Sequence, residues 1–427
     1  ICLRQKQKGT YFMNLTKHFS PYRTPFPMEP IPEPVFPDRE VDSSAFSSIQ
    51  KAIEHCSTLG GGTVRVPAGR WKSAAIHLRS GIRLHLEKGA AILFSSRPED
   101  YLPPVFTRWE GMECYNYSPL IYAEGCENVA VTGEGTLLGN GSSWWHWKKL
   151  QQAAADRLCG SEADGIPVSE RIYGTERAAL RPSFLQFINC RRVLLESITV
   201  LDGPQWTLHP VYCENVIVRN VHIHTEGPNT DGLNPDSCRN VLIEDCDFCT
   251  GDDCIALNSG MNEDGWRVNR PCENILIRRC RMTGGHGGLV IGSAVSGGVR
   301  NVYAHDCEIS GTMQGIRLKS MRGRGGFVEH VLFEDIRVSG ITHEALTISM
   351  FYPFSTVVPR SETPSSFRDI TIRRVHGTGL HTGIELRGLP EQKLSDVRLE
   401  AIRLSAPNAF VCVDVEGLVM DGVEVTG

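Results

Sequence analysis

The sequence has no long apolar run and no excess of positive charge. No hydrophobic stretch approaches the roughly 18 residues that a membrane-spanning helix needs, so we do not expect a membrane protein. Lysine and arginine together number 44, against 49 aspartates and glutamates, which gives a net charge of −5. Neither a nucleic acid nor an anionic membrane is therefore expected as the main partner. An acidic ligand would need a local basic patch.

Paired metal-binding cysteines are also lacking. The 15 cysteines are an odd number in a 427-residue chain, unlike the even set of a small disulfide-stapled scaffold. Cys246 and Cys249 form the single Cys-x-x-Cys spacing, and no second pair or neighbouring histidine follows. Because a zinc site needs about four ligands, we expect buried, reduced thiols, no metal and no cofactor.

Residues 1–12 contain neither a start methionine nor the apolar stretch of a signal peptide. Met13 could be the true start, although a signal peptide that had already been removed would leave the same sequence. The cysteine content suits a reducing compartment. We expect a cytoplasmic protein, with a secreted or periplasmic one as the alternative.

The N-terminal part differs in composition from the rest of the chain. Seven prolines between residues 21 and 37 predict an extended strap over the surface. Asp42 then offers a helix N-cap, and the spacing of Phe46, Ile49 and Ile53 predicts a short amphipathic helix that caps one end of the remaining domain. We expect an N-terminal extension and strap over residues 1–40 and one catalytic domain over residues 41–427.

From Gly60 onward the sequence is periodic. An Asn-(Val/Ile) step recurs, and from Asn215 its successive spacings, continued by His330, Asp369 and Asp396, are 25, 34, 27, 29, 39 and 27 residues. A second strand-like segment comes after each step, about one third of a period later. The steps lie at Asn128, Asn215, Asn240, Asn274 and Asn301, and the second segments begin at Asp231, Asp253, Gly287, Gln314, Glu344 and Gly383.

Short alternating strands with glycine and asparagine at the corners are typical of a β-solenoid. Leucine-rich repeats would show a fixed leucine framework, and propeller blades would be longer with hairpin turns; the sequence shows neither. We predict an all-β fold, a single right-handed parallel β-helix of about ten coils. Loop insertions on one face would account for the variable spacing.

Aligning the second segments on their apolar anchors places unusual polar residues in one stripe. Asp231 and Asp253 share one slot, and Asp252 and His286 share the slot before it. Because coils stack about 4.8 Å apart, these residues should converge with Arg317 and Lys319 of a later coil. Asp252 and Asp253 can both face the cleft only on a turn before the strand, which Gly251 permits. The anchors are Leu233, Ile255, Leu289, Ile316 and Leu346.

This combination of charges indicates glycosidic cleavage of an acidic sugar. Clustered carboxylates raise one another's pKa, so that one can act as a general acid while another stays ionised as a base. Between Ile309 and Val328 there are four basic residues and no acid, which provides the local patch for an anionic substrate. A single corner aspartate is more often structural; the joint arrangement carries the prediction.

Four ordered motifs make the chain resemble the polygalacturonases, glycoside hydrolase family 28, over roughly residues 40 to 400. They are Asn229-Thr-Asp231, Gly251-Asp-Asp253, Gly285-His-Gly287 and Arg317-Leu-Lys319. The resemblance implies a right-handed β-helix and metal-independent, inverting hydrolysis of α-linked galacturonate in a pectic polymer or oligomer.

The resemblance also implies roles for individual residues. Asp252 would be the general acid and His286 would support its protonation, while Asp231 and Asp253 would hold and activate water. Arg317 and Lys319 would bind the substrate carboxylate. Asn229 would line the cleft, and Tyr352 is the candidate for a tyrosine that the family places about one coil after the last motif.

A long insertion from Trp144 to Pro182 is similar to those of bacterial exo-acting members, as are the segments at 106–112 and 116–120. Such loops would close one end of the cleft and make a pocket for chain ends. Alternatively, Trp144, Trp145 and Trp147 only pack the insertion onto the solenoid.

Several functions stay open at this point. The leading prediction is an exo-polygalacturonase, and an endo-acting or rhamnogalacturonan hydrolase of the same family is the main alternative. A β-helix lyase with Ca²⁺ on the aspartate cluster and Arg317 as base is a further alternative. A non-catalytic carbohydrate-binding solenoid is the least specific of them.

Overall fold

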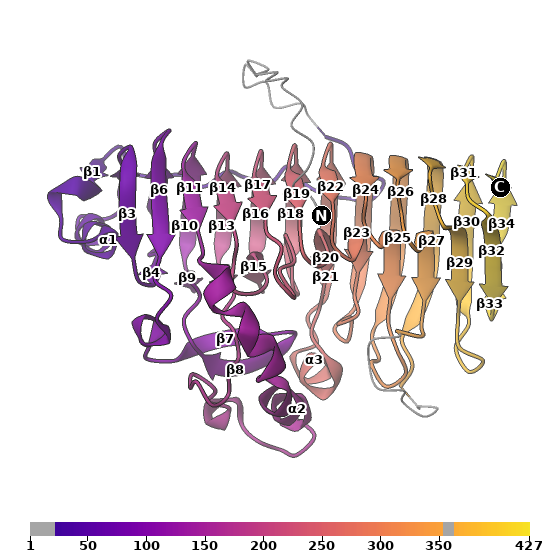
Figure 1. Cartoon of the computed structure of the whole chain (residues 1–427), viewed down its shortest axis with the longest axis horizontal. Coiled ribbons are helices and arrows are strands. Elements are labelled where there is room, and N and C mark those ends of the chain that lie inside the picture. The colour runs from indigo at the N-terminus through magenta and orange to yellow at the C-terminus, as the bar shows by residue number, and fades with distance from the viewer. Residues whose placement is uncertain (1–21, 353–362) are drawn as a thin grey trace.

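The chain winds into one right-handed parallel β-helix, described here by a computed structural model over residues 22–352 and 363–427. Figure 1 shows the coils side by side from α1 (Ile49–Thr58) at one end to the C-terminal strands at the other. One very long sheet and two shorter sheets form the faces of the coils. The prediction of an all-β parallel solenoid is confirmed.

The first ladder of the long sheet pairs one strand from each coil in parallel. Its strands are β1 (Glu40–Asp42), β2 (Gly62–Val66), β5 (Ile82–Leu86), β10 (Glu127–Gly133), β13 (Arg191–Glu196), β16 (Glu214–Arg219), β18 (Arg239–Glu244), β21 (Cys272–Arg278), β24 (Val299–Ser310), β26 (Phe327–Ser339), β28 (Ser366–Thr378), β30 (Leu394–Glu400), β33 (Val415–Glu416) and β34 (Val419–Asp421).

A second ladder continues each coil around the corner. It contains β3 (Gly69–Ser73), β6 (Ala90–Phe94), β11 (Thr136–Leu138), β14 (Thr199–Leu201), β17 (His222–His224), β19 (Asp247–Cys249) and β22 (Arg281–Thr283), and at the other end β31 (Arg403–Ser405) and β35 (Glu424–Thr426).

The third face carries the second strand-like segment of each repeat. Its first four strands are β4 (Ile76–His77), β9 (Ile121–Glu124), β12 (Leu185–Ile188) and β15 (Leu208–Val211). Isolated bridges Leu208–Leu233 and Leu233–Ile255 connect them to the rest of the face. That part consists of β20 (Ile255–Leu257), β23 (Gly287–Ile291), β25 (Gln314–Lys319), β27 (Glu344–Ser349), β29 (Thr382–Arg387) and β32 (Asn408–Val413).

A left-handed residue near the beginning of the first-ladder strands explains the asparagine repeat. All five repeat asparagines have positive φ, between 54° and 60°, and His330, Asp369 and Asp396 adopt the same conformation. Asparagine tolerates this left-handed region better than most residues. The amide of Asn240 donates to Asn215 (3.2 Å), and that of Asn274 donates to Asn240 (2.9 Å). The repeat therefore marks a turn and a hydrogen-bonded ladder along the helix axis.

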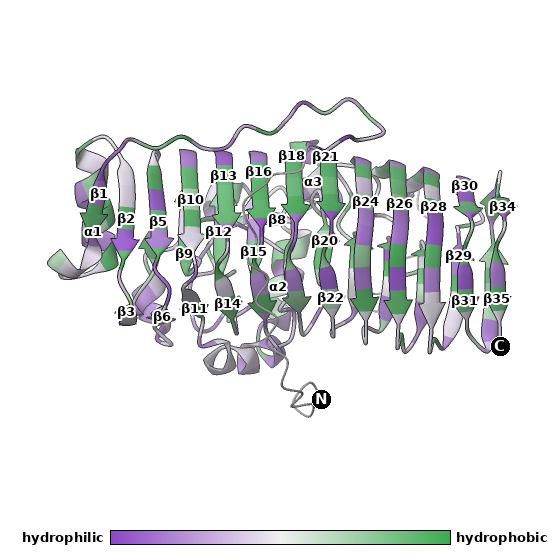
Figure 2. Ribbon diagram, turned by 90° about the horizontal axis from the view of Figure 1, so that it is seen from above, coloured by the Kyte–Doolittle hydropathy of each residue, from purple (hydrophilic) through white to green (hydrophobic). Residues whose placement is uncertain are grey.

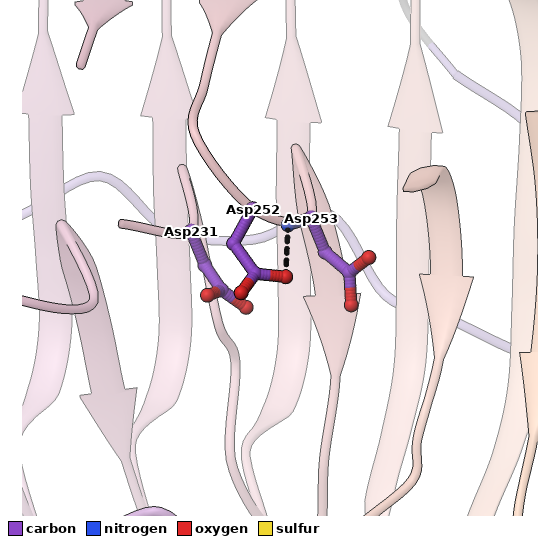
Figure 3. A group of neighbouring side chains, drawn as sticks. All are labelled: Asp231, Asp252 and Asp253. Carbon is purple, nitrogen blue, oxygen red and sulfur yellow. Dashed lines mark hydrogen bonds between the residues drawn. The ribbon is translucent and has the colours of Figure 1, made fainter. Parts of the chain in front are cut away.

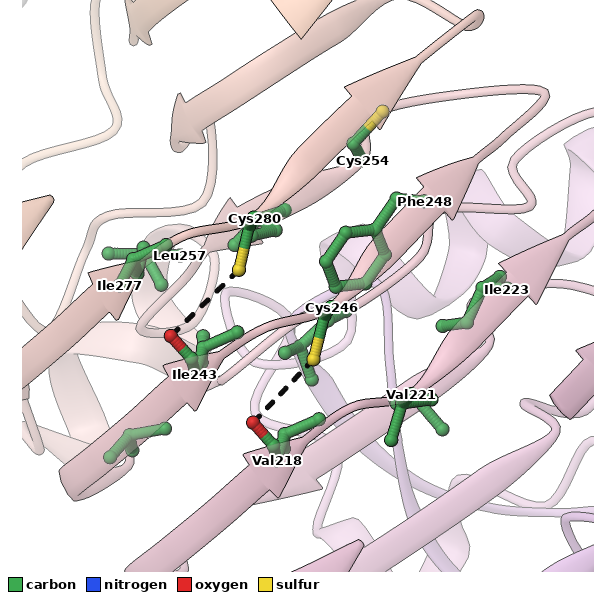
Figure 4. Close-up of a cluster of buried hydrophobic side chains, with 14 of the residues drawn as sticks. Val218, Val221, Ile223, Ile243, Cys246, Phe248, Cys254, Leu257, Ile277 and Cys280 are labelled. Carbon is green, nitrogen blue, oxygen red and sulfur yellow. Dashed lines mark hydrogen bonds between the residues drawn. The ribbon is translucent and has the colours of Figure 1, made fainter. Parts of the chain in front are cut away.

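The interior is filled by stacked aliphatic side chains and thiols. Figure 4 shows Cys246 and Cys280 among valines and isoleucines, with each thiol donating to a carbonyl of the preceding coil, at 3.6 and 3.9 Å. All cysteines of the described residues are free thiols, and most are buried. Cys246 and Cys249 of the Cys-x-x-Cys spacing thus belong to ordinary strand packing.

The predicted end-capping helix is present, but it begins later than expected. Asp42 caps only a 3-10 turn (Ser43–Ala45), and α1 begins at Ile49 with Ser48 as its N-cap. Both Asp42 and Ser48 carry side chains that can cap a helix, so the sequence is compatible with a helix that begins after either residue. Residues Ile49, Ala52, Ile53 and Cys56 face the first coils.

The proline-rich strap runs alongside the long sheet, past the upper ends of its first-ladder strands in Figure 2. Its Tyr22, Met28, Ile31 and Phe36 cover a row of outward apolar residues on successive strands. That row consists of Ala130, Leu194, Ile217, Leu242 and Leu276. Residues 22–37 of the predicted strap follow this course, and residues 1–21, including Met13, lie outside the described part of the chain.

Long additions to the solenoid gather along one side of its N-terminal half (Figure 1). They are the antiparallel hairpin β7 (Val105–Trp109)–β8 (Met112–Asn116), α2 (Gln152–Gly160) and α3 (Asn262–Val268). No helix in the described ranges is long and apolar enough to cross a membrane.

Candidate active site

The register of the third face brings the predicted residues together. Leu233 pairs with Ile255, Ile255 with Leu289, and Leu289 with Ile316. The predicted alignment of anchors is therefore the actual pairing of the strands. It places Asp231 beside Asp253 and Asp252 beside His286 on neighbouring coils.

Three carboxylates meet at the start of β20 (Figure 3). One oxygen from each of Asp231, Asp252 and Asp253 lies within 4.8 Å of the others. Asp252 and Asp253 occupy the bend before the strand, where the Asp253 amide donates to Asp252 Oδ1 (3.0 Å). A Cβ on Gly251 would come within 2.3 Å of the Gly227 carbonyl. The prediction that Gly251 permits this bend is confirmed.

Each carboxylate has its own nitrogen partner. Asn234 Nδ2 donates to Asp231 Oδ2 (2.9 Å), and Lys319 Nζ donates to Asp253 Oδ2 (2.6 Å). His286 Nδ1 lies 2.9 Å from Asp252 Oδ1. The three aspartates form an acidic group that a cation could also enter, but the Lys319 ammonium already neutralises Asp253.

These partners separate the ionisation of the aspartates. Burial raises the pKa of Asp231 well above its usual value, and the charges of Asp252 and Asp253 add to the shift. Burial also opposes ionisation of Asp252, but the hydrogen bond from His286 and the Lys319 charge outweigh it and lower the Asp252 pKa. Within the cluster, protonation is therefore more favourable at Asp231 than at Asp252.

The pKa values of His286 and Lys319 are both raised, which favours their protonated forms. The hydrogen bond to Asp252 raises the pKa of His286 despite partial burial. Burial acts to lower the pKa of Lys319, but Asp253 outweighs this effect and raises it. His286 and Asp252 thus share a proton across a short contact, with the charged pair favoured.

The predicted carboxylate-binding cations lie on β25. Arg317 Nη1 is 3.7 Å from Asp253 Oδ1. The Tyr352 ring centroid lies 5.5 Å from the Arg317 guanidinium carbon and 5.0 Å from Lys319 Nζ. The structure therefore brings Tyr352 to the site, where the family resemblance placed a tyrosine.

A groove of about 620 Å³ extends from these cations toward the C-terminal coils. Its walls include Arg317, Lys319, Tyr352, Arg387 and Val413. Because Arg387 lies on β29 and Val413 on β32, the groove crosses several coils. Its shape suits an extended chain rather than a compact small molecule.

The opposite side of the carboxylates is crowded. Asn229 Nδ2 lies 3.5 Å from Asp252 Oδ2, and its Oδ1 accepts from the buried Arg181 (2.8 Å). Burial lowers the pKa of Arg181 to about 10, with Glu110 and Asp252 opposing the shift. The pairing of Leu208 with Leu233 puts the half-exposed Trp206 beside Asp231, one coil earlier.

Sequence reasoning missed Trp206, Arg181 and Glu110. Extending the anchor alignment one coil back, from Leu233 to Leu208, would have found Trp206. Arg181 and Glu110 belong to segments outside the repeat, so no periodic signal could have placed them. Asn234 stood inside an aligned segment, three residues after Asp231, and could have been recognised as its partner.

The three tryptophans of the insertion pack against the solenoid in two different places. Trp144 and Trp147 are buried with Tyr101 and Tyr117 in the main core. Trp145 instead packs against Gly227, where an added Cβ would lie 2.2 Å from its ring, and donates to the Gly203 carbonyl (3.0 Å). Packing onto the solenoid accounts for all three, and Trp145 packs at Gly227, whose carbonyl lies next to Gly251 in the bend that carries Asp252.

This geometry defines a carbohydrate-cleaving class of protein, and comparison with known proteins specifies the family. A family model described as "Glycosyl hydrolases family 28" matches residues 171–421, more than half of the chain. The chain therefore belongs to glycosyl hydrolase family 28 and is a glycoside hydrolase. Membership of a hydrolase family also argues against the alternative that the protein is a Ca²⁺-dependent lyase.

Several proteins that are similar to this chain are named as polygalacturonases or galacturonosidases. A solved structure described as a hyperthermoactive exopolygalacturonase from Thermotoga maritima is 37% identical, with a TM-score of 0.85 over 92% of this chain and 94% of that one. A probable polygalacturonase of Vitis vinifera is 28% identical, covering 88% of this chain and 75% of that protein. An exo-poly-alpha-D-galacturonosidase of Dickeya chrysanthemi is 25% identical, covering 80% and 61% respectively.

Proposed function

We propose that the protein is an exo-acting polygalacturonase, which releases galacturonate from the ends of α-1,4-linked galacturonides with inversion. The observation that carries the exo assignment is the asymmetry of the cleft about its carboxylates. On the N-terminal side Trp145, Trp206 and Glu110 of the β7–β8 hairpin, which contacts Gln205, crowd the coils next to Asp231. On the C-terminal side the groove continues for several coils.

The hairpin is held as a fixed wall. Buried Arg108 of β7 donates to Asp236 Oδ1 (2.9 Å) and to Ser237 (2.9 Å), both on the solenoid. At the tip, a Cβ on Gly111 would lie 3.2 Å from the Met261 Cβ and 3.4 Å from that of Ala294. A buried ion pair loses its compensation when one partner leaves, so the hairpin stays seated against the coils of β20 and β23.

The groove supports an acidic polymer as substrate. Arg317 can bind a sugar carboxylate through its planar fork and Lys319 through its ammonium charge. Arg387 continues the cationic lining further along the groove, interspersed with His343, Glu344 and Glu385. A chain with a carboxylate on every sugar would meet these groups in succession.

In this proposal the Asp252–His286 pair supplies the acidic proton. The 2.9 Å contact lets the proton move from His286 to Asp252 as the glycosidic oxygen takes up charge. The bond between the anomeric carbon and that oxygen breaks, and the leaving oxygen receives the Asp252 proton. A water held between Asp231 and Asp253 attacks the anomeric carbon and gives up a proton to the Asp253 carboxylate.

The first test is incubation with purified oligogalacturonates in the presence of a chelator, with product sizing from the earliest time points. Galacturonate alone from the start supports the proposal. A spread of intermediate sizes would indicate an endo-acting cleft, and no cleavage would direct attention to rhamnogalacturonan. Loss of activity with chelator would contradict metal-independent hydrolysis.

A further inference from the structure

We propose that Glu110, at the tip of the β7–β8 hairpin, determines chain-end specificity by accepting a hydrogen bond from the free 4-hydroxyl of the non-reducing terminal galacturonate. The proposal rests on the proposed exo-acting function and names the group that recognises the chain end. In the same position the carboxylate repels the carboxylate of any further galacturonate, so that only a terminal sugar fits.

The backbone of the turn presents Glu110 to the cleft at a conformational cost. Only Glu110 and Gly111 separate β7 from β8, and both have positive φ, at 45° and 89°. Such two-residue turns favour asparagine or glycine at both positions. A glutamate in the left-handed region is unfavourable, and residues of this kind concentrate at functional sites.

A buried amide orients the Glu110 carboxylate. Gln205 Nε2 donates to Glu110 Oε1 (2.8 Å), and Gln205 Oε1 accepts from Trp109 Nε1 (3.1 Å). Gln205 directly precedes Trp206, which lies beside Asp231 in the strand register. Glu110 is therefore fixed on the coil adjacent to the reacting carboxylates, and only one of its oxygens is used by Gln205.

Charged groups of the proposed site influence Glu110. Burial raises its pKa, Lys148 and Arg181 oppose that shift, and Asp252 adds to it. Arg181 in turn holds Asn229, which contacts Asp252. Arg181 and Asn229 thus connect the surroundings of Glu110 with those of Asp252. In the proposal a terminal hydroxyl at Glu110 meets a carboxylate acceptor, whereas the carboxylate of a further sugar meets the Glu110 carboxylate itself.

The experiment compares kcat/KM for trigalacturonate, its 4,5-unsaturated counterpart, which lacks the terminal 4-hydroxyl, and borohydride-reduced trigalacturonate. We expect wild type to cleave the saturated trimer at least about tenfold faster than the unsaturated one, because a site built around a hydroxyl rejects analogues that lack it. Borohydride reduction of the reducing end should change kcat/KM little.

Two variants separate the carboxylate from the turn. Glu110→Asn keeps a residue that tolerates the left-handed conformation but shortens and neutralises the side chain, and we expect it to bring the ratio of saturated to unsaturated trimer close to one. Glu110→Gln keeps the reach without the charge and should admit longer ends, seen as oligomeric products. Glu134→Gln, an exposed glutamate on the solenoid, is the matched control, and unchanged thermal unfolding confirms folding.

The outcomes also separate this proposal from the exo function itself. Oligomeric products from wild type at the earliest times would overturn the exo function. Galacturonate as sole wild-type product, with the same saturated-to-unsaturated ratio in wild type and Glu110→Asn, would overturn the role of Glu110 alone. A wild-type preference that depends on the reducing end would overturn the assigned direction of the chain.

Discussion

At the residue scale, the contact between Asp252 and His286 sets the protonation of the proposed acid. Asp252→Asn removes the transferable proton while preserving the shape of the side chain. Because general acids contribute typically 10²–10⁴-fold, we expect kcat to fall by about 10³, with oligogalacturonate affinity and thermal unfolding nearly unchanged. Titration calorimetry and steady-state rates check this. Unchanged turnover would remove Asp252 from the acid role.

The same pair predicts the alkaline side of the pH profile. The His286 pKa is raised by Asp252, so its protonated form, which supplies the acid, persists above pH 6.5 and is lost as pH rises through the raised value. We expect kcat/KM to decline on that side with a midpoint above 6.5. In His286→Gln most activity should be lost and this titration should disappear; an identical alkaline midpoint in that variant would contradict the assignment.

Lys319 tests recognition of the sugar carboxylate. In Lys319→Ala the charged hydrogen bond to substrate is lost and Asp253 loses its 2.6 Å partner. A hydrogen bond to a charged group contributes about 1.5–3 kcal/mol, so kcat/KM on galacturonides should fall at least tenfold. Methyl-esterified oligomers, which lack the carboxylate charge, serve as the comparison. Equal losses on both substrates would show that Lys319 only maintains the aspartate cluster.

At the element scale, the strap stabilises the long sheet by covering apolar side chains that would otherwise face water. Ile31 is 9% exposed in that contact, whereas Val35 on the same strap is 75% exposed. Ile31→Asp should cost about 2–3 kcal/mol, from lost burial and an uncompensated charge, and lower the melting temperature by several degrees. Val35→Asp is the matched control and should leave it unchanged. Equal melting temperatures would mean that the strap adds no stability.

The elements also show which local signals sequence can supply. Proline content predicted the strap and helical spacing predicted α1, because both depend on local backbone preferences. The helix start was misplaced since Asp42 and Ser48 can each cap a first turn. The hairpin wall could not be predicted: Arg108 reaches Asp236 and Glu110 reaches Gln205 only after the coils have stacked, and no local pattern encodes those contacts.

At the scale of the whole molecule, charge alternation fixes the register of the coils. Outward positions on neighbouring first-ladder strands bear opposite charges, coil after coil, and such cross-strand pairs favour the correct pairing over a slipped one. The order along one row is Glu127, Arg191, Glu214, Arg239, Glu273, Arg300 and Glu329. A second row runs through Glu196, Arg219, Glu244 and Arg278.

This alternation was visible in the sequence, directly after the recurring cysteines Cys126, Cys190, Cys213, Cys238 and Cys272. The repeat predicted the solenoid and, through the anchor residues, the convergence of Asp231, Asp252, Asp253 and His286. It could not give the ionisation of that cluster. The opposite pKa shifts of Asp231 and Asp252 depend on burial and on the individual partners Asn234, His286 and Lys319, which only the folded coils define.

The asymmetric cleft has a kinetic consequence under the proposed function. A galacturonate cut off against the hairpin wall lies behind the new end of the polymer, so the polymer must withdraw before the monosaccharide can escape. Each turnover then ends with complete release of the chain, and the enzyme shortens many chains by one unit each rather than one chain to completion. Degradation would be distributive, with the length distribution of a monodisperse substrate shifting gradually as a single population.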